Sequence, residues 1–201
     1  MTEWSGPLIE SPFLQLYYQM REKKIILPLT DKDIKSLKSG DRVLLTGTIY
    51  TARDAAHKRL SLDLKKPPLD LKGAVIYYSG PTPAMPGRAI GSAGPTTAGR
   101  MDGYALMTLK AGIKAMIGKG ARSKEVRDLM KRYKAVYFAA TGGAGALLAK
   151  HVKSAKIVAY PDLGPEAIYE LKVADFPVIV ANDIKGNDIF EQGVKKYRKK
   201  V

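Results

Sequence analysis

From about residue 25 onward, short runs of apolar residues alternate with amphipathic segments. Runs rich in β-branched and aromatic residues predict strands, whereas apolar residues spaced three or four apart predict helices. The predicted strands are 25–29, 43–50, 74–78, 115–118, 135–140, 156–160 and 177–181. The predicted helices are 31–37, 52–62, 101–113, 124–133, 144–152 and 188–196. This alternation is typical of an α/β domain with a mostly parallel central sheet.

Polar residues mark the points where several helices begin. Thr30 or Asp31 precedes the first helix, Ser123 precedes the fourth and Asn187 precedes the last. Side chains of these types accept hydrogen bonds from the free N–H groups of a first helical turn. One stretch, residues 79–99, is rich in Gly, Pro and Thr and has little periodicity. Because so long an irregular connection is uncommon in a compact domain, it indicates a functional loop.

The loop ends in the segment 91–102, which reads Gly-Ser-Ala-Gly-Pro-Thr-Thr-Ala-Gly-Arg-Met-Asp. Its small residues let the backbone approach a ligand closely, and the helix that follows offers free N–H groups to an anion. Thr96 and Thr97 add hydroxyl groups, and Arg100 adds a guanidinium that can bind a carboxylate through two parallel hydrogen bonds. The alternative is a Gly-rich connection in which Thr97 caps a helix and Arg100 is solvated. The pattern alone supports both interpretations equally.

Further cations lie near other strand ends. Arg53 and Asp54 follow the strand at 43–50, and ligands of α/β domains gather at the carboxyl ends of strands. Arg53 could instead form an ion pair with Asp54. For His57, one helical turn further on, a packing or surface position is favoured over catalysis. Lys119 lies between two glycines, where a tight turn can present its charge to an anion. These residues together indicate an anionic, carboxylate-like ligand.

The composition narrows the class of protein. With 201 residues, 45% of them hydrophobic, the chain can bury one core, so we expect a single domain over 1–201. The chain has no cysteine, which excludes disulfides, thiolate nucleophiles and cysteine ligands for zinc or iron–sulfur clusters. With only His57 and His151, an all-protein histidine metal site is not expected. No apolar run reaches the roughly 18 residues of a spanning helix, and residues 1–7 do not resemble a signal peptide, so we expect a cytoplasmic protein.

The chain is strongly basic. Lys and Arg total 34 against 19 Asp and Glu, giving a formal net charge of +15. This excess favours anionic partners: nucleic acid, an acidic subunit or a small anionic substrate. Part of the charge lies in residues 195–200, where we favour a solvated helix end whose cations complement the helix dipole over a binding tail. Aromatic residues make up only 8% and do not interleave with the basic clusters, which argues against a nucleic-acid-binding module.

Several segments of the sequence resemble the β subunit, or equivalently the C-terminal domain, of class I fumarases and L(+)-tartrate dehydratases. The most specific block is Gly-Pro-Thr-Thr-Ala-Gly-Arg-Met-Asp at 94–102. The other blocks lie at 47–57, 119–120, 142–144, 160–168, 175–177 and 183–188. All of them occur in the order found in the family, so their agreement is not a coincidence of composition.

The resemblance implies a three-layer β/β/α swivelling fold, with the active site between this domain and a part that carries a [4Fe–4S] cluster. Since the chain lacks cysteine, we expect the cluster on a separate α subunit, none on this chain, and an α2β2-like hetero-oligomer. The implied reaction is the reversible hydration of a dicarboxylate, fumarate, to (S)-malate. The alternatives are the β subunit of an L(+)-tartrate dehydratase, a basic nucleic-acid-binding module, and a purely structural partner subunit.

The resemblance also implies roles for individual residues. Thr96 matches the threonine proposed as the catalytic base of the family. Arg53, Arg100 and Lys119 match the cations that bind the substrate carboxylates. The residues expected to support the site are Asp54, His57 and Thr97. No residue of this chain is expected to bind a metal ion.

Overall fold

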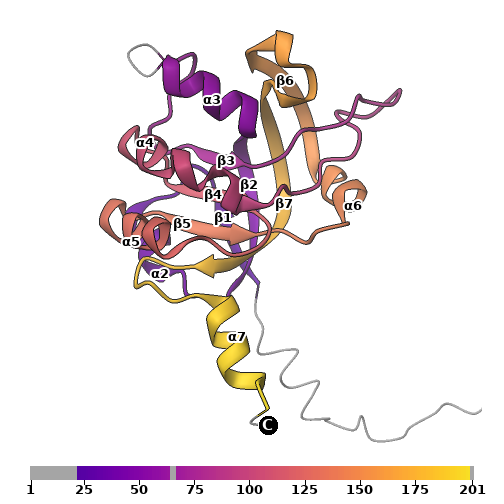
Figure 1. Cartoon of the computed structure of the whole chain (residues 1–201). Coiled ribbons are helices and arrows are strands. Elements are labelled where there is room, and N and C mark those ends of the chain that lie inside the picture. Colours follow the sequence, from indigo (N-terminus) through magenta and orange to yellow (C-terminus); the bar gives the residue numbers. More distant parts are fainter. Residues whose placement is uncertain (1–21, 64–66, 200–201) are drawn as a thin grey trace, which may run out of the picture.

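The computed structural model describes residues 22–63 and 67–199, which form helices around a central sheet (Figure 1). The strands are β1 (Lys23–Ile26), β2 (Arg42–Thr51), β3 (Val75–Tyr77), β4 (Ala115–Gly118), β5 (Val136–Ala139), β6 (Val152–Ala159) and β7 (Ile168–Asn182). The helices are α2 (Asp31–Ser36), α3 (Asp54–Leu62), α4 (Ala105–Lys110), α5 (Lys124–Tyr133), α6 (Gly145–Ala149) and α7 (Ile189–Tyr197), with 3-10 helices η1 (Ala98–Tyr104) and η2 (Pro161–Glu166). This alternation confirms the predicted α/β class. The helices found in residues 22–63 and 67–199 all lack the length and hydrophobicity that spanning a bilayer requires.

The strand β7 closes the sheet on itself. β1 to β5 pair in parallel and follow one another in chain order. β7 runs antiparallel to both β2 and β5, so that β2, β3, β4, β5 and β7 form a ring, while β1 and β6 pair only at its margins. The prediction of a mostly parallel sheet therefore holds for β1 to β5 and is wrong for β6 and β7. Because the ring is closed, the described chain does not separate clearly into three layers.

The core has two parts because successive strand residues point to opposite faces. Val75 and Tyr77 of β3 belong to one buried cluster, which also contains Phe138 and Phe176. Ile76, between them, belongs to a second cluster that the helices α3, α4 and α5 cover. Burying a large apolar side chain of this kind contributes about 1.5–3 kcal/mol. The parallel strands are thus packed on both faces, which holds the strand ends that carry the candidate site in place.

Local chemistry sets most of the helix boundaries. Thr30 and Ser123 are N-caps, as predicted, and each side chain accepts a hydrogen bond from a backbone N–H of the first turn. The last helix begins one residue later than predicted, because Asp188 rather than Asn187 is its cap. The loop after β3 contains no helix or strand up to residue 97 among the described residues, as its composition indicated.

Three other segments differ from their predicted extent. The strand predicted at 177–181 is only the end of the 15-residue β7. Asp175 in that strand has a φ of +48° and Pro177 has no N–H group, so both interrupt the sequence pattern although pairing continues. β6 begins at Val152, which shortens the predicted helix before it. The helix predicted at 101–113 is a 3-10 turn, η1, followed by the short α4.

Candidate active site

The candidate residues lie at one edge of the sheet. β2, β3 and β4 are parallel, so their carboxyl ends meet at that edge. Arg53 lies two residues after β2, and Lys119 directly follows β4. The irregular loop leaves β3 at Tyr78 and returns to the same edge at Thr96. The topology thus gathers residues from three separate parts of the sequence.

The segment around Thr96 is held between the ends of β3 and β4. The backbone N–H of Thr96 donates to the carbonyl of Tyr78 at 2.6 Å, and the N–H of Lys119 donates to the carbonyl of Thr96 at 3.0 Å. The N–H of Ala98 then donates to the carbonyl of Lys119 at 2.8 Å. Gly118 allows this approach, because a Cβ there would lie 2.9 Å from the Tyr78 ring. Thr96, which is half-buried, is therefore fixed beside the exposed Lys119.

Arg100 is bound by Asp54 across two elements. Arg100 lies on η1 and Asp54 is the first residue of α3. The Nε of Arg100 lies 3.0 Å from Oδ1 of Asp54, and the Nη2 of Arg100 lies 2.8 Å from Oδ2 of Asp54. Only the Nε contact is a hydrogen bond, and Oδ2 has no hydrogen-bond partner among the described residues, so Arg100 is held by one charge-assisted hydrogen bond and a close ion-pair contact. Half of the Arg100 side chain, 52%, is still exposed, so Asp54 orients the guanidinium and leaves it accessible to an anion.

Arg53 is more enclosed. Its Nη2 lies 3.5 Å from Oε1 of Glu166, whose other oxygen accepts a hydrogen bond from the Ala55 N–H at 2.9 Å. Its Nε lies 3.9 Å from Oδ2 of Asp54, and within the described residues it has no hydrogen-bond partner. The predicted pair of Arg53 with Asp54 is therefore a loose one. A buried N–H of a charged group without a partner is costly, so this Nε is a strained point of the site.

His57 stabilises the start of α3. Its side chain is buried, and its Nδ1 lies 2.8 Å from the carbonyl oxygen of Arg53. Since a carbonyl only accepts, Nδ1 must carry the proton. Burial lowers the pKa of His57 to about 4, so the ring is neutral at neutral pH, and it packs against the rings of Tyr78 and Tyr104. The geometry favours the packing interpretation of this residue.

A buried arginine behind the site was not predicted from the sequence. The Arg122 side chain is fully buried and donates to Asp102 Oδ1 at 2.7 Å and to the Tyr78 hydroxyl at 3.0 Å. Its guanidinium carbon lies 5.4 Å and 5.5 Å from the ring centres of Tyr78 and Tyr137. Burial alone would lower the pKa of Arg122. The interactions with Tyr78 and Asp102 outweigh the effect of burial and raise the pKa, so the guanidinium stays charged.

Arg122 connects the elements that carry the candidate residues. Asp102, its partner, lies on η1 two residues after Arg100, and also accepts a hydrogen bond from the Ser123 N–H at 2.9 Å. The Tyr78 backbone holds Thr96, and the Tyr137 hydroxyl donates to the carbonyl of Gly120, next to Lys119, at 2.8 Å. In the sequence, Arg122 lies between the small residues Ala121 and Ser123 and looks like any other cation. Only its contacts with Tyr78, Tyr137 and Asp102 in the structure show that it is buried.

The described residues do not fit a metal or cluster site. They contain no group of three or more His, Cys, Asp or Glu side chains that could hold a metal ion. The full sequence contains no cysteine, the residue that ordinarily holds an iron–sulfur cluster. At this edge the chain instead offers three cations, a half-buried threonine hydroxyl and two carboxylates that orient the arginines. That arrangement suits the binding of an anion with more than one carboxylate.

Fold and site together define a basic α/β domain that presents arginine and lysine side chains to an anion at the ends of parallel strands. The chain belongs to the Fumarase C-terminus family, whose model matches residues 10–193. The resemblance found in the sequence is thereby confirmed at the level of the family.

Individual relatives agree with this assignment. The chain is 44% identical over 182 residues to a protein of Methanocaldococcus jannaschii named putative L(+)-tartrate dehydratase subunit beta, covering 86% of this chain and 93% of that protein. It is 44% identical over 160 residues to the anaerobic class I fumarate hydratase of Escherichia coli, covering 77% of this chain and 29% of the relative. It is 42% identical over 158 residues to fumarate hydratase 2 of Leishmania major, covering 76% of this chain and 28% of the relative. The chain thus spans less than a third of these two fumarate hydratases.

Proposed function

We propose that this chain is the β subunit of a hydro-lyase that reversibly hydrates fumarate to (S)-malate, at a site completed by a second chain. The observation that carries the proposal is that Lys119 lies beside Thr96 at the edge of the sheet where Arg53 follows β2 and Asp54 pairs with Arg100. The family membership supports the hydro-lyase reaction, because the chain matches class I fumarate hydratases over part of their length.

The three cations would bind the two carboxylates of the substrate. Arg100 would grip one carboxylate with the part of its guanidinium that Asp54 leaves exposed. Arg53 would use the part of its side chain that stays exposed, and Lys119 would add a point charge. Fixing a flexible dianion at several points places its double bond in a defined orientation, which lowers the entropic part of the barrier.

Thr96 would act as the base that takes the C3 proton of malate and returns it to fumarate in the other direction. A threonine hydroxyl is a weak acid in water, so its deprotonated form requires nearby positive charge, whose effect is stronger where water is excluded. Lys119, whose backbone is bonded to that of Thr96, would supply the charge. The second chain would exclude water by covering the edge, and Thr97, Asp54 and His57 would support the geometry.

The cluster implied by the family would be held by a cysteine-bearing α subunit, because this chain has no cysteine. When bound there, it would supply a Lewis acid for a substrate carboxylate and hydroxyl. We propose an α2β2-like assembly in which residues 1–201 form a single domain of the swivelling type, built on the closed sheet described above. This chain alone would then be inactive.

The test is to produce the chain together with its α subunit under anaerobic conditions and to follow fumarate hydration. The expected result is turnover by the pair and none by either chain alone. Arg100→Ala should abolish turnover while the pair still assembles, and Arg132→Ala, an exposed arginine on α5, is the matched control. A pair with its cluster in place that hydrates neither fumarate nor tartrate would refute the proposal. Loss of assembly in Arg100→Ala would favour a purely structural role.

The second candidate is an L(+)-tartrate dehydratase β subunit. It is favoured by the Methanocaldococcus jannaschii relative, which this chain matches over 93% of its length. Both substrates are dicarboxylates, and tartrate differs from malate by an added hydroxyl group. Comparing kcat/KM for malate and L(+)-tartrate on the same assembled pair separates the two candidates.

A further inference from the structure

The last helix, α7, carries an apolar stripe that the described chain does not cover. Phe190, Val194 and Tyr197 recur four and three residues apart, so they lie on one face. Their exposed fractions are 36%, 62% and 74%. No residue of α7 is buried against the described part of the chain. Figure 1 shows the helix projecting from the body of the molecule.

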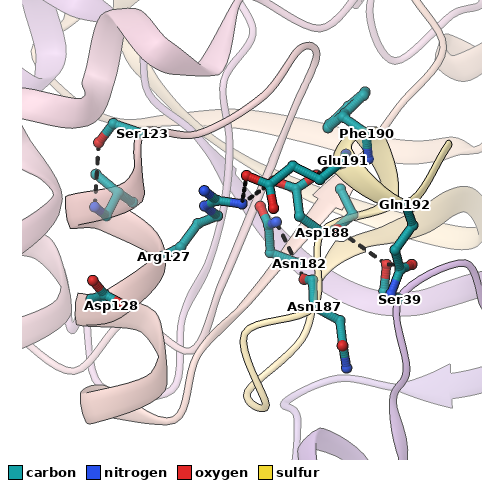
Figure 2. Close-up of polar contacts among 12 residues, drawn as sticks. Ser39, Ser123, Arg127, Asp128, Asn182, Asn187, Asp188, Phe190, Glu191 and Gln192 are labelled. Atoms are coloured by element: carbon teal, nitrogen blue, oxygen red, sulfur yellow. Dashed lines mark hydrogen bonds and ion pairs between the residues drawn. The ribbon is translucent and has the colours of Figure 1, made fainter. Parts of the chain in front are cut away.

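The start of α7 is nevertheless held firmly. Asp188 is 3% exposed and caps the helix by accepting from the N–H groups of Phe190 and Glu191 at 2.7 Å and 3.3 Å. Nη1 of Arg127, on α5, lies 2.9 Å from Asp188 Oδ2 and 2.7 Å from Glu191 Oε1. Figure 2 shows the arginine reaching both carboxylates. The first turn is therefore fixed to α5 by a mostly buried charge pair.

A second set of contacts fixes the other side of the first turn. The Ser39 hydroxyl donates to Gln192 Oε1 at 3.1 Å (Figure 2). The buried Asp183 accepts from the Ser39 N–H at 3.0 Å and from the Asn187 side-chain amide at 2.8 Å. A nine-residue helix without such contacts would be marginal in water. The fold thus holds α7 in one orientation while its apolar stripe stays uncovered, which reduces the ordering cost of binding.

The charge of α7 indicates what could cover it. Lys195 and Lys196 lie in its last turn, and Arg198 and Lys199 follow directly. Its one acid, Glu191, is already paired with Arg127. Two copies of α7 packed together would bring these cations close to one another, which disfavours a second copy as the occupant. An apolar groove with an acidic rim is complementary to both the stripe and the charge.

We propose that α7 is a docking helix, whose stripe of Phe190, Val194 and Tyr197 enters an apolar groove with an acidic rim on the cysteine-bearing partner chain. This inference rests on the proposed function, which supplies that partner. α7 lies at the opposite edge of the sheet from the candidate active site, because Asn182, at the end of β7, pairs with Tyr137 near the amino end of β5. Substitutions on α7 can therefore weaken binding of the partner without changing residues of the candidate active site.

The experiment measures the dissociation constant between the purified full chain and the partner chain. In the double variant Val194→Glu/Tyr197→Glu, we expect that constant to rise at least tenfold. Turnover per complex at saturating partner should stay unchanged, since the active-site edge is untouched. Leu62→Glu is the matched control: Leu62 ends α3 and is 79% exposed, and its variant should bind within twofold of the unchanged chain. Circular dichroism and thermal unfolding confirm that each variant is folded.

Several outcomes would overturn the inference. The double variant could bind the partner as tightly as the unchanged chain, or the unchanged chain could fail to bind it at all. The chain alone could sediment as a dimer that the double variant dissociates, making a second copy the occupant. Removal of residues 1–21 could increase amide exchange in α7 of the isolated chain, making that segment the occupant. A complex that forms but hydrates neither fumarate nor tartrate contradicts the proposed function and not the docking inference. In that case the dissociation constant of the double variant still tests whether α7 docks on the partner.

Discussion

The orientation of Arg100 depends on a single carboxylate, since Asp54 binds its Nε and Nη2 and leaves half of the side chain exposed. Lysine in its place would keep the charge and lose the planar fork, which is the part that can bind Asp54 and a substrate carboxylate together. We expect Arg100→Lys to lower kcat/KM for fumarate by about 10- to 100-fold, the range of one charge-assisted hydrogen bond. Arg132→Lys should leave it unchanged. An Arg100→Lys pair with full activity would show that only the charge matters.

His57 gives the stability of the chain a pH dependence. Its pKa is lowered to about 4 by burial, whereas in the unfolded chain it is about 6.5. As the pH falls below 6.5 the unfolded state takes up the proton first, so this contribution to stability is complete above pH 6.5 and is lost towards pH 4. We expect it to cost about 2 kcal/mol of unfolding free energy between pH 7.5 and pH 5. His57→Asn keeps a donor for the Arg53 carbonyl and should remove this pH-dependent loss of unfolding free energy, as measured by urea unfolding at pH 7.5 and pH 5. His151→Asn should leave the loss that His57 causes in place.

At the scale of elements, Arg122, in the loop after β4, joins Tyr78 after β3 and Tyr137 of β5 to Asp102 on η1. Removing one partner of a buried ion pair leaves an uncompensated charge, which costs about 3–5 kcal/mol. We therefore expect Arg122→Leu and Asp102→Leu each to lower the unfolding free energy by that amount, and the double variant to lose much less than their sum. Urea unfolding of all three measures this coupling. Additive losses would mean that the two side chains stabilise the fold independently.

The elements that the sequence predicts well are those set by local chemistry. The N-caps Thr30 and Ser123 and the buried parallel strands follow from side-chain type and spacing, and they are confirmed. The resemblance brought Thr96, Arg100 and Lys119 to one site, and the structure does place Thr96 beside Lys119. The pairing of Arg53 with Glu166 and the burial of Arg122 were not predicted. Each depends on a partner more than 15 residues away, which spacing along the chain does not encode.

At the scale of the whole molecule, the closed sheet was the main feature that the pattern missed. β7 pairs with β2 and with β5, strands that begin more than 90 residues apart in the sequence. Alternation of strands and helices predicts the parallel part, because each crossover is local. It does not predict closure by a strand whose first half is partly polar and whose centre contains Asp175 and Pro177. The same strand also carries α7 to the edge away from the candidate site.

The net charge of +15 is a property of the whole molecule. The salt dependence of association shows whether this charge serves an acidic protein chain or a nucleic acid. If the partner is an acidic protein chain, long-range attraction should raise the association rate at low salt and leave dissociation nearly unchanged. We expect the association rate with the α subunit to fall at least tenfold between about 0.05 M and 0.5 M NaCl, where screening shortens the range of the field. Stopped-flow mixing measures it. Submicromolar, strongly salt-dependent binding to RNA or DNA, with a salt-insensitive association with the α subunit, would instead assign the charge to nucleic acid.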